Sequence, residues 1–130
     1  MGKKLKKSTE LRIRVRYAET DAMGIAHHTS FLVWFEEARS EYLRMRGGDY
    51  RELEQRGIHL PVVELTCRYL APARYGDLLI VEAWLARMDS RTLTFRYRVR
   101  MAETGEELAT GSTRHTCVDE RGRVRRLPAE

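Results

Sequence analysis

The 130-residue chain contains only two cysteines, three prolines and no long run of apolar residues. Cys67 and Cys117 lie in separate strand-like stretches without the spacing of a zinc site, so we expect neither a bound metal nor a disulfide framework. No apolar run approaches the ~18 residues that a membrane-spanning helix needs. The basic N-terminus has no apolar segment behind it, which excludes a secretory signal. These absences favour a cytoplasmic protein without a membrane span.

The residues that are present predict one globular domain. Hydrophobic residues make up 42% of the chain and charged residues 33%, a balance typical of a folded soluble protein. A chain of this length holds one core of adequate size but not two. We therefore expect residues 1–9 to form a basic N-terminal tail and residues 10–130 to form a single domain. The net charge of +5 suggests an anionic partner, although part of it lies in the two ends of the chain.

The first half of the chain predicts a strand followed by a long helix. Residues 11–17, LRIRVRY, alternate between apolar side chains and arginines, which indicates a half-buried strand with Tyr17 on its apolar face. A helix is predicted over residues 30–46, with Thr29 or Ser30 capping its first amides and two glycines ending it. The first half of this helix is apolar in every direction, which is typical of a helix enclosed by other structure.

The second half of the chain is predicted to be rich in β-strands. Turn-forming residues separate a short helix, four strands and a short final strand, which we place at residues 49–55, 62–70, 78–87, 92–101, 108–118 and 123–127. A strand, a long helix and then four or five antiparallel strands predict an α+β fold in which one curved sheet wraps the helix. A single sheet of this size leaves an edge and an incomplete core, so we expect the protein to dimerise.

Polar and titratable groups gather immediately before the apolar helix. Residues 19–31 read ETDAMGIAHHTSF, with two carboxylates, a glycine and two adjacent histidines. Taken alone, an aspartate ahead of a helix is more often a cap or turn residue than a catalytic one. The first amides of a helix, however, have no intrahelical partners and lie at the positive end of its dipole. The segment is therefore either a helix cap or a functional site.

The run RYAETDAMGIAHHTSFLVWFEEAR, residues 16–39, resembles the hotdog-fold acyl-CoA thioesterases of the 4-hydroxybenzoyl-CoA thioesterase and YbgC-like group. The matching positions of this sequence are Asp21, Gly24, His27, His28, Glu37 and Arg39. Residues 63–83 also resemble the family's second strand and the turns after it, so that the likeness covers about residues 11–118. The resemblance implies a central helix wrapped by a curved antiparallel sheet. It also implies a homodimer with active sites at the subunit interface, commonly paired into a homotetramer.

The resemblance further implies hydrolysis of an acyl-CoA thioester to a free acid and coenzyme A. Asp21 would act as nucleophile or general base, two roles that the sequence leaves open. A backbone N–H near His28 would polarise the thioester carbonyl, and Gly24 would allow the tight turn before the helix. Coenzyme A is part of the substrate, so no cofactor is expected. Adjacent side chains such as those of His27 and His28 rarely bind one metal ion.

Further residues are expected to bind the substrate. The phosphates of coenzyme A favour arginines near the mouth of the pocket. By their rough family position, the candidates are Arg91, Arg125 and Arg126, although each alone is more often a surface charge. Glu64 lies where a strand of a second subunit could approach the site, and His27 and Phe31 stand at positions of the acyl pocket. Because HTSF replaces the more usual HANY, the acyl group stays open: aliphatic or aromatic, on coenzyme A or an acyl carrier protein.

Two other functions remain open from the sequence. A hydratase or dehydratase of the same fold would pair a catalytic histidine with an acid from the helix, for which His28 and Glu37 are the candidates. The H-F-P context of such enzymes does not occur in this sequence. A nucleic-acid-binding module would contact phosphates with the arginines of RIRVR and RYRVR. Because Tyr17 and Tyr97 fall on the opposite, apolar faces of these strands, we expect no nucleic acid partner.

Overall fold

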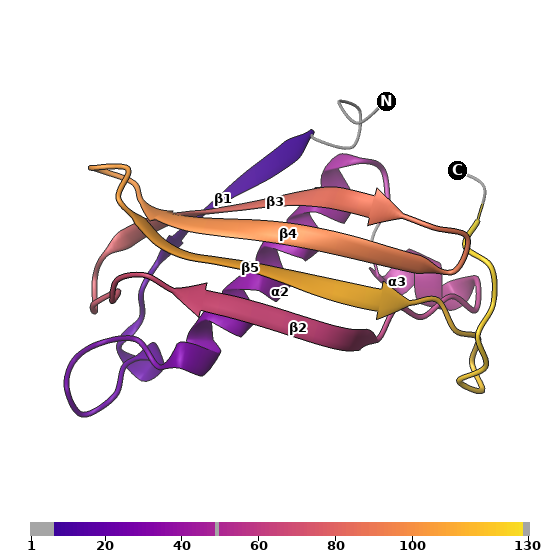
Figure 1. Ribbon diagram of the computed structural model, residues 1–130, viewed down its shortest axis with the longest axis horizontal. Coiled ribbons are helices and arrows are strands. Elements are labelled where there is room, and N and C mark those ends of the chain that lie inside the picture. Colours follow the sequence, from indigo (N-terminus) through magenta and orange to yellow (C-terminus); the bar gives the residue numbers. More distant parts are fainter. Residues whose placement is uncertain (1–6, 49, 129–130) are drawn as a thin grey trace.

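The computed structural model describes residues 7–48 and 50–128 and places a long helix against one face of a five-stranded antiparallel sheet (Figure 1). The strands are β1 (Ser8–Arg14), β2 (Val62–Tyr69), β3 (Leu78–Met88), β4 (Thr92–Met101) and β5 (Glu107–Thr116). The helices are α2 (His28–Met45), the short α3 (Tyr50–Gln55) and the 3-10 helix η1 (Tyr17–Glu19). The strand order is β1-β3-β4-β5-β2, and neighbouring strands are antiparallel. The predicted α+β fold, with one sheet around one helix, is confirmed.

The helix packs on the centre of the sheet through large aromatic side chains. Trp34 and Phe35 are fully buried, and the Phe35 ring stacks on that of Tyr97 in β4 with 4.4 Å between ring centroids. Gly111 of β5 makes this approach possible, because a Cβ atom there would lie 2.5 Å from the Phe35 ring. The position of α2 along the sheet is therefore fixed at one point of very close contact.

One side of α2 and the free edge of β2 are not covered by the chain. Val33 on the helix is 47% exposed, and Val63 and Leu65 on β2 are 50% and 42% exposed. β2 has a neighbouring strand, β5, on one side only, so its other edge presents unpaired backbone groups. The prediction of a helix enclosed on every side is therefore wrong for the single chain, because the sheet covers one face of α2.

The first strand begins and ends earlier in the chain than predicted. β1 covers Ser8–Arg14 instead of residues 11–17, so its first residues belong to the stretch 1–9 that was expected to be a tail. Residues 1–6 of that stretch lie outside the described residues. After β1 the chain leaves the sheet and turns into η1. As a result Tyr17 is 78% exposed and does not lie on the apolar face as predicted.

The long helix begins at His28 instead of Ser30, and the predicted caps do not form. His27 occupies the position before the helix without a side-chain capping hydrogen bond. The Ser30 hydroxyl lies inside the helix and donates to the Glu19 carbonyl oxygen at 3.1 Å. No helix in the described part of the chain is long and apolar enough to cross a membrane.

Two short elements also differ from the prediction. Within residues 7–48 and 50–128 no strand forms at 123–127, where Val124 makes only an isolated bridge to Val118. α3 begins at Tyr50, and Asp49, which was predicted to start this helix, lies outside the described residues.

A chain of buried hydrogen bonds connects α2 with β4 and β5. Arg39 Nη1 donates to Tyr97 Oη at 3.0 Å, and Tyr97 Oη lies 2.6 Å from Thr113 Oγ1. Thr113 Oγ1 lies 2.8 Å from His115 Nε2, and His115 Nδ1 lies 2.9 Å from the Leu60 carbonyl oxygen. A carbonyl oxygen only accepts and a guanidinium only donates, so every bond is satisfied when Nδ1 carries the proton and Nε2 accepts. The network therefore favours a neutral His115.

The environment of His115 also favours its neutral form, because it lowers the pKa of this residue. Burial lowers the pKa of His115 to about 4 and outweighs the hydrogen bond to Leu60, and the positive charge of Arg39 lowers it further. If Nε2 were also protonated, its N–H would point at the Thr113 hydroxyl, which in this network already donates toward Nε2. His115 thus stays neutral in the folded protein at pH values where a solvated histidine is already charged.

We predict that His115 makes the fold less stable as the pH falls. In the folded protein its pKa is about 4, against an ordinary value of 6.5. The unfolded chain therefore binds more protons between these values, and the free energy of unfolding should fall by about 2 kcal/mol from pH 7 to pH 5. Urea unfolding followed by circular dichroism at both pH values measures the difference.

A His115→Gln variant should be less stable at pH 7 but should lack this part of the pH dependence. His59→Gln removes a histidine outside the buried network and should keep it. Equal stability of the unmodified protein at pH 5 and pH 7 would contradict the prediction.

Candidate active site

A cavity of about 380 Å³ lies where the N-terminal end of α2 meets the C-terminal end of β2. Its walls come from the loop before α2, the first turn of α2 and the segment after β2: Asp21, Ile25, Ala26, His28, Phe31, Tyr69, Leu70, Ala71 and Pro72. In Figure 1 this is the lower left end of the molecule, where the loop before α2 lies near the arrowhead of β2. The cavity joins a carboxylate, a helix end and an apolar wall.

A larger hollow, of about 600 Å³, lies on the outer face of the sheet, away from α2. Its lining includes Arg68, Trp84, Arg96 and Arg98 with several hydroxyl groups, but neither a carboxylate nor a helix end. Of the aromatic residues that could stack on nucleic-acid bases, Tyr97 is 1% exposed and packs against α2, whereas Trp84 lines this hollow. We therefore take the smaller cavity as the candidate active site.

Asp21 lies in a tight turn that fixes one of its two carboxylate oxygens. Its Oδ1 accepts hydrogen bonds from the N–H groups of Met23 (2.8 Å) and Ile25 (3.3 Å). Gly24 in this turn has a φ of 81°, a conformation that glycine adopts without strain. Nothing in the described part of the chain donates a hydrogen bond to Oδ2. The turn therefore leaves one oxygen of Asp21 available for chemistry.

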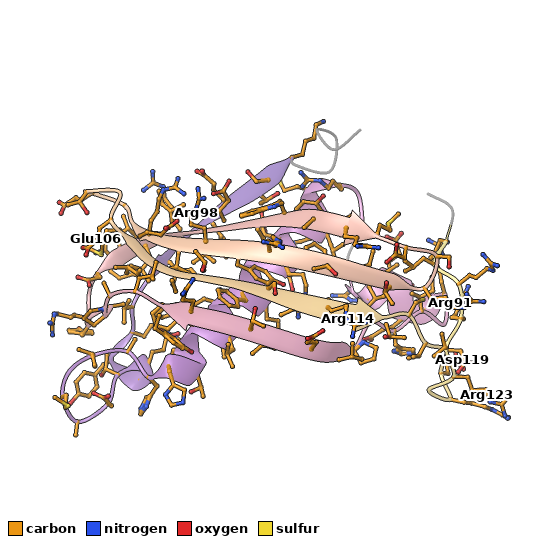
Figure 2. All side chains as sticks on the ribbon, viewed as in Figure 1. Arg91, Arg98, Glu106, Arg114, Asp119 and Arg123 are labelled. Atoms are coloured by element: carbon orange, nitrogen blue, oxygen red, sulfur yellow. The ribbon has the colours of Figure 1, made fainter. Side chains whose placement is uncertain are left out.

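The same turn occurs a second time, at residues 119–123. Asp119 Oδ1 accepts from the N–H groups of Arg121 and Arg123, both at 2.9 Å, and Gly122 has a φ of 83°. Asp119 lies at the end of the molecule opposite the cavity (Figure 2). The D-x-x-G pattern therefore encodes a turn in both places. What distinguishes Asp21 is that its turn lies beside a helix end.

The first N–H groups of α2 are available to a ligand. The His27 N–H donates to the Glu19 carbonyl oxygen (2.8 Å), and the Ser30 N–H donates to the His27 carbonyl oxygen (3.0 Å). Between these two, the N–H groups of His28 and Thr29 have no acceptor among the described residues. They lie at the positive end of the helix dipole. An oxygen atom placed in the cavity beside His28 can accept a hydrogen bond there.

Tyr69, at the end of β2, was not identified from the sequence. Its hydroxyl donates to the His28 carbonyl oxygen at 2.6 Å, and its ring contacts Phe31 edge-on with 5.2 Å between centroids. Burial raises the pKa of Tyr69 well above its usual value, so the hydroxyl stays protonated and can donate. Strand alternation places Tyr69 on the inner face, but sequence spacing does not reveal its contact with a helix far away in the chain.

Glu19 is a second carboxylate of this loop, and it is buried. Its Oε1 accepts from the Arg16 N–H (2.8 Å), and its Oε2 accepts from Trp34 Nε1 (3.0 Å) and Arg16 Nη2 (3.1 Å). Burial alone would raise the pKa of Glu19, but the hydrogen bonds from Arg16 and Trp34 lower it below its usual value. Glu19 does not line the cavity. The sequence showed it only as one of two acids before the helix.

Of the predicted site residues, Asp21, His28 and Phe31 line the cavity together, and Gly24 shapes its turn. His27 is exposed at the helix start and does not line it.

Other predicted residues lie elsewhere in the single chain. Glu64 is on the outer face of β2, where it pairs with Arg114 at 3.1 Å and its side chain is 63% exposed. Glu37, the acid of the hydratase alternative, is exposed on α2 and does not line the cavity with His28.

The three predicted ligands of coenzyme A lie together at the other end of the sheet. Figure 2 shows Arg91 in the turn between β3 and β4, at the end opposite the cavity. The segment with Arg125 and Arg126 runs beside this turn, because the Leu127 N–H donates to the Ser90 carbonyl oxygen at 2.8 Å. Within one chain the structure therefore does not bring these arginines to Asp21.

Known proteins resemble the chain in both sequence and structure. The sequence model of the thioesterase-like superfamily matches residues 15–130. The putative acyl-CoA thioesterase YneP of Bacillus subtilis is 35% identical over 82% of this chain and 77% of its own. A hypothetical protein of Thermus thermophilus, TT1821, is 45% identical, with a TM-score of 0.87 over 94% of this chain and 90% of its own. The DHNA-CoA thioesterase of Staphylococcus aureus is 32% identical, with a TM-score of 0.88 over 92% and 80%. These likenesses confirm the predicted hotdog fold.

Proposed function

The chain belongs to the thioesterase-like superfamily, and we propose on this premise that it hydrolyses an acyl-CoA thioester to a free acid and coenzyme A. The observation that carries the proposal is one cavity lined by Asp21, with a free Oδ2, and by His28, with an unpaired N–H. Relatives named as thioesterases of acyl-CoA and DHNA-CoA support the substrate class. The proposed enzyme uses neither a metal nor a cofactor. The free thiols of Cys67 and Cys117 are compatible with a reducing cytoplasm, where we place it.

In this proposal the backbone at the start of α2 activates the thioester. The carbonyl oxygen accepts a hydrogen bond from the His28 N–H, with the Thr29 N–H as a second possible donor. These groups polarise the carbonyl and stabilise the negative charge that develops on its oxygen, where one such donor is commonly worth ~100-fold in rate. The hydroxyl of Tyr69 holds the His28 carbonyl at 2.6 Å and so helps to fix the orientation of the helix start.

Asp21 acts on the carbonyl carbon in one of two ways. As a nucleophile, Oδ2 forms a mixed anhydride with the acyl group and releases coenzyme A as its thiolate, and water then hydrolyses the anhydride. As a general base, Oδ2 takes a proton from a water molecule that attacks the carbonyl directly; the C–S bond then breaks, and coenzyme A leaves as its thiolate and recovers the proton from Asp21. Both routes need the oxygen that the turn leaves without a hydrogen-bond donor.

The apolar part of the cavity would hold the acyl group. Phe31 lines the cavity and is 2% exposed, and the ring of Tyr69 lies edge-on to the Phe31 ring. Leu70 and Ala71 extend this wall beyond β2. Such a lining favours an apolar acyl group, whether aliphatic or aromatic.

We further propose that two copies pair along β2, as the resemblance implied. The unpaired edge of β2 and the exposed Val63 and Leu65 would be covered by a second copy. A strand that pairs with its own copy about a two-fold axis is antiparallel to it, so the second copy is turned end for end. The end of the second copy that is opposite its own cavity would then lie near the cavity of the first copy. Two such dimers would form the expected tetramer.

This pairing would bring the predicted ligands of coenzyme A to the active site. Arg91, Arg125 and Arg126 lie at the end of the chain opposite its own cavity. In the antiparallel pair, the arginines of one copy would lie on the side of the other copy's cavity. Their guanidinium groups are suited to the pyrophosphate and the 3′-phosphate of the substrate. Glu64, on β2, would lie near the same interface.

Replacing Asp21 with asparagine should greatly slow turnover while leaving the turn intact. The asparagine Oδ1 can still accept from Met23 and Ile25, but its Nδ2 can neither attack the carbonyl nor take a proton from water. We expect kcat to fall by ~10²–10⁴-fold, the usual contribution of such a group. Thiol release from acyl-CoAs of different chain length measures kcat and KM for both proteins.

The matched control is Asp119→Asn, which removes the same charge from the same kind of turn. It should leave kcat within about twofold, because the proposal gives Asp119 no contact with the thioester. A near-normal rate in the Asp21 variant would remove Asp21 from the mechanism. No turnover of any acyl-CoA by the unmodified protein would refute the proposed function.

Leu65→Glu should separate the paired chains. It would place two carboxylates close to the two-fold axis of the proposed interface, where like charges oppose association. Sedimentation at micromolar concentration should show a dimer or tetramer for the unmodified protein and a monomer for the variant. Arg12→Glu, an exposed site on β1 at the opposite edge of the sheet from β2, should not change the assembly. A monomeric unmodified protein would contradict the pairing.

Arg91→Glu should raise the KM for acyl-CoA and leave kcat unchanged. A carboxylate near the phosphates weakens binding of the substrate and its transition state equally, since the phosphates do not react. Arg12→Glu makes the same change of charge on β1, the edge strand far from β2, and should leave KM within about twofold. An unchanged KM for the Arg91 variant would exclude Arg91 as a ligand.

A further inference from the structure

We propose that Glu19 is a positioning residue that holds the start of α2 and the Asp21 turn in one fixed relation. The inference rests on the proposed function, because the groups it positions are Asp21 Oδ2 and the N–H groups of His28 and Thr29. Glu19 is 9% exposed and does not line the cavity. It therefore acts on the reaction only through other residues.

The carboxylate of Glu19 is attached to the rigid core of the protein. Both of its oxygens are occupied, one by the Arg16 N–H and the other by Trp34 Nε1 and Arg16 Nη2. Trp34 is fully buried, and its ring packs on Phe31 with 4.7 Å between centroids. The side chain thus connects η1 with a part of α2 that cannot move without disturbing the core.

The backbone carbonyl of Glu19 makes the second connection to the helix. It accepts the His27 N–H at 2.8 Å and the Ser30 hydroxyl at 3.1 Å. With Trp34, these contacts fall on successive turns of one face of α2, since residues three and four apart share a face. Because His27 is already bonded to Glu19, the next N–H groups, of His28 and Thr29, are the ones left for a ligand.

A short loop, closed by backbone contacts, connects Glu19 to Asp21 and fixes their relative position. Thr20 and Ala26 form an antiparallel bridge, and the Asp21 N–H donates to the Ile25 carbonyl oxygen at 2.8 Å. The carboxylate of Asp21 and the helix start are therefore held by the same residue from two sides. A displacement of about 1 Å in such a site can lower the rate ~100-fold.

The test compares Glu19→Gln with Glu82→Gln. The glutamine amide would turn an N–H toward the donors of Arg16 or Trp34, which breaks the connection without changing the size of the side chain. Glu82 is a matched control, because its side chain is 18% exposed and pairs with Arg100 at 3.5 Å on the outer face. We expect Glu19→Gln to lower kcat by ~100-fold with KM within about threefold, and Glu82→Gln to change neither by more than about twofold.

Two further measurements separate positioning from a general loss of stability. Hydrogen exchange of the His27 amide, followed by NMR, should be faster in Glu19→Gln and unchanged in Glu82→Gln, because only the first loosens the bond to the Glu19 carbonyl. If Glu19→Gln does not fold, Trp34→Phe provides the test. It removes the indole donor and part of the ring but leaves both hydrogen bonds from Arg16 to Glu19, and we expect about tenfold lower kcat with little change in KM.

Two results would overturn the positioning role of Glu19. A Glu19→Gln protein that is folded and has a kcat within about twofold of normal overturns the proposal, as does a loss of rate that only follows the unfolded fraction. If the unmodified protein hydrolyses no acyl-CoA, the proposed function fails. The His27 exchange rate then still shows whether Glu19 holds the helix start, and an unchanged rate overturns this role as well.

Discussion

The close contact between Phe35 and Gly111 sets the geometry of the whole site. With no room for a Cβ atom at Gly111, the Phe35 ring reaches the backbone of β5 and stacks on Tyr97. The helix cannot slide along the sheet without breaking this contact. Its first turn is therefore held at the end of β2, where the Tyr69 hydroxyl reaches the His28 carbonyl. Core packing thus determines where the unpaired N–H groups of α2 are presented.

Sequence patterns predicted most of the fold, and the resemblance named three residues that line the candidate cavity, Asp21, His28 and Phe31, but neither revealed the contacts that hold them. Alternation located the strands, and the family resemblance around D-x-x-G and the adjacent histidines led to Asp21, while the helix begins at His28, two residues before the predicted start. The ends of elements were less predictable, because Tyr17 continues the alternation of β1 after the chain has left the sheet. Tyr69 and Glu19 were missed since their partners, His28 and Trp34, are far from them in the sequence.

The single chain carries the candidate cavity and the proposed ligands of coenzyme A at opposite ends of its sheet. The cavity lies at one end of the sheet, and the cluster of Arg91, Arg125 and Arg126 lies at the other. Both the open edge of β2 and the exposed Val33 on α2 leave apolar surface uncovered. An antiparallel pair of chains would bring the arginines of one copy to the side of the other copy's cavity and would also cover exposed apolar surface. The distribution of charge and of exposed apolar surface therefore supports the same assembly.

Glu19 and Asp21 lie in one short loop, but their carboxylates have different hydrogen-bond partners. Three hydrogen-bond donors occupy the oxygens of Glu19, which lowers its pKa and keeps it charged, but leaves little of its basicity for a substrate. Asp21 uses one oxygen for its turn and keeps the other free of donors. The turn itself does not create this difference, since Asp119 has the same one. In the proposed mechanism, the donors around these two carboxylates therefore give them different tasks.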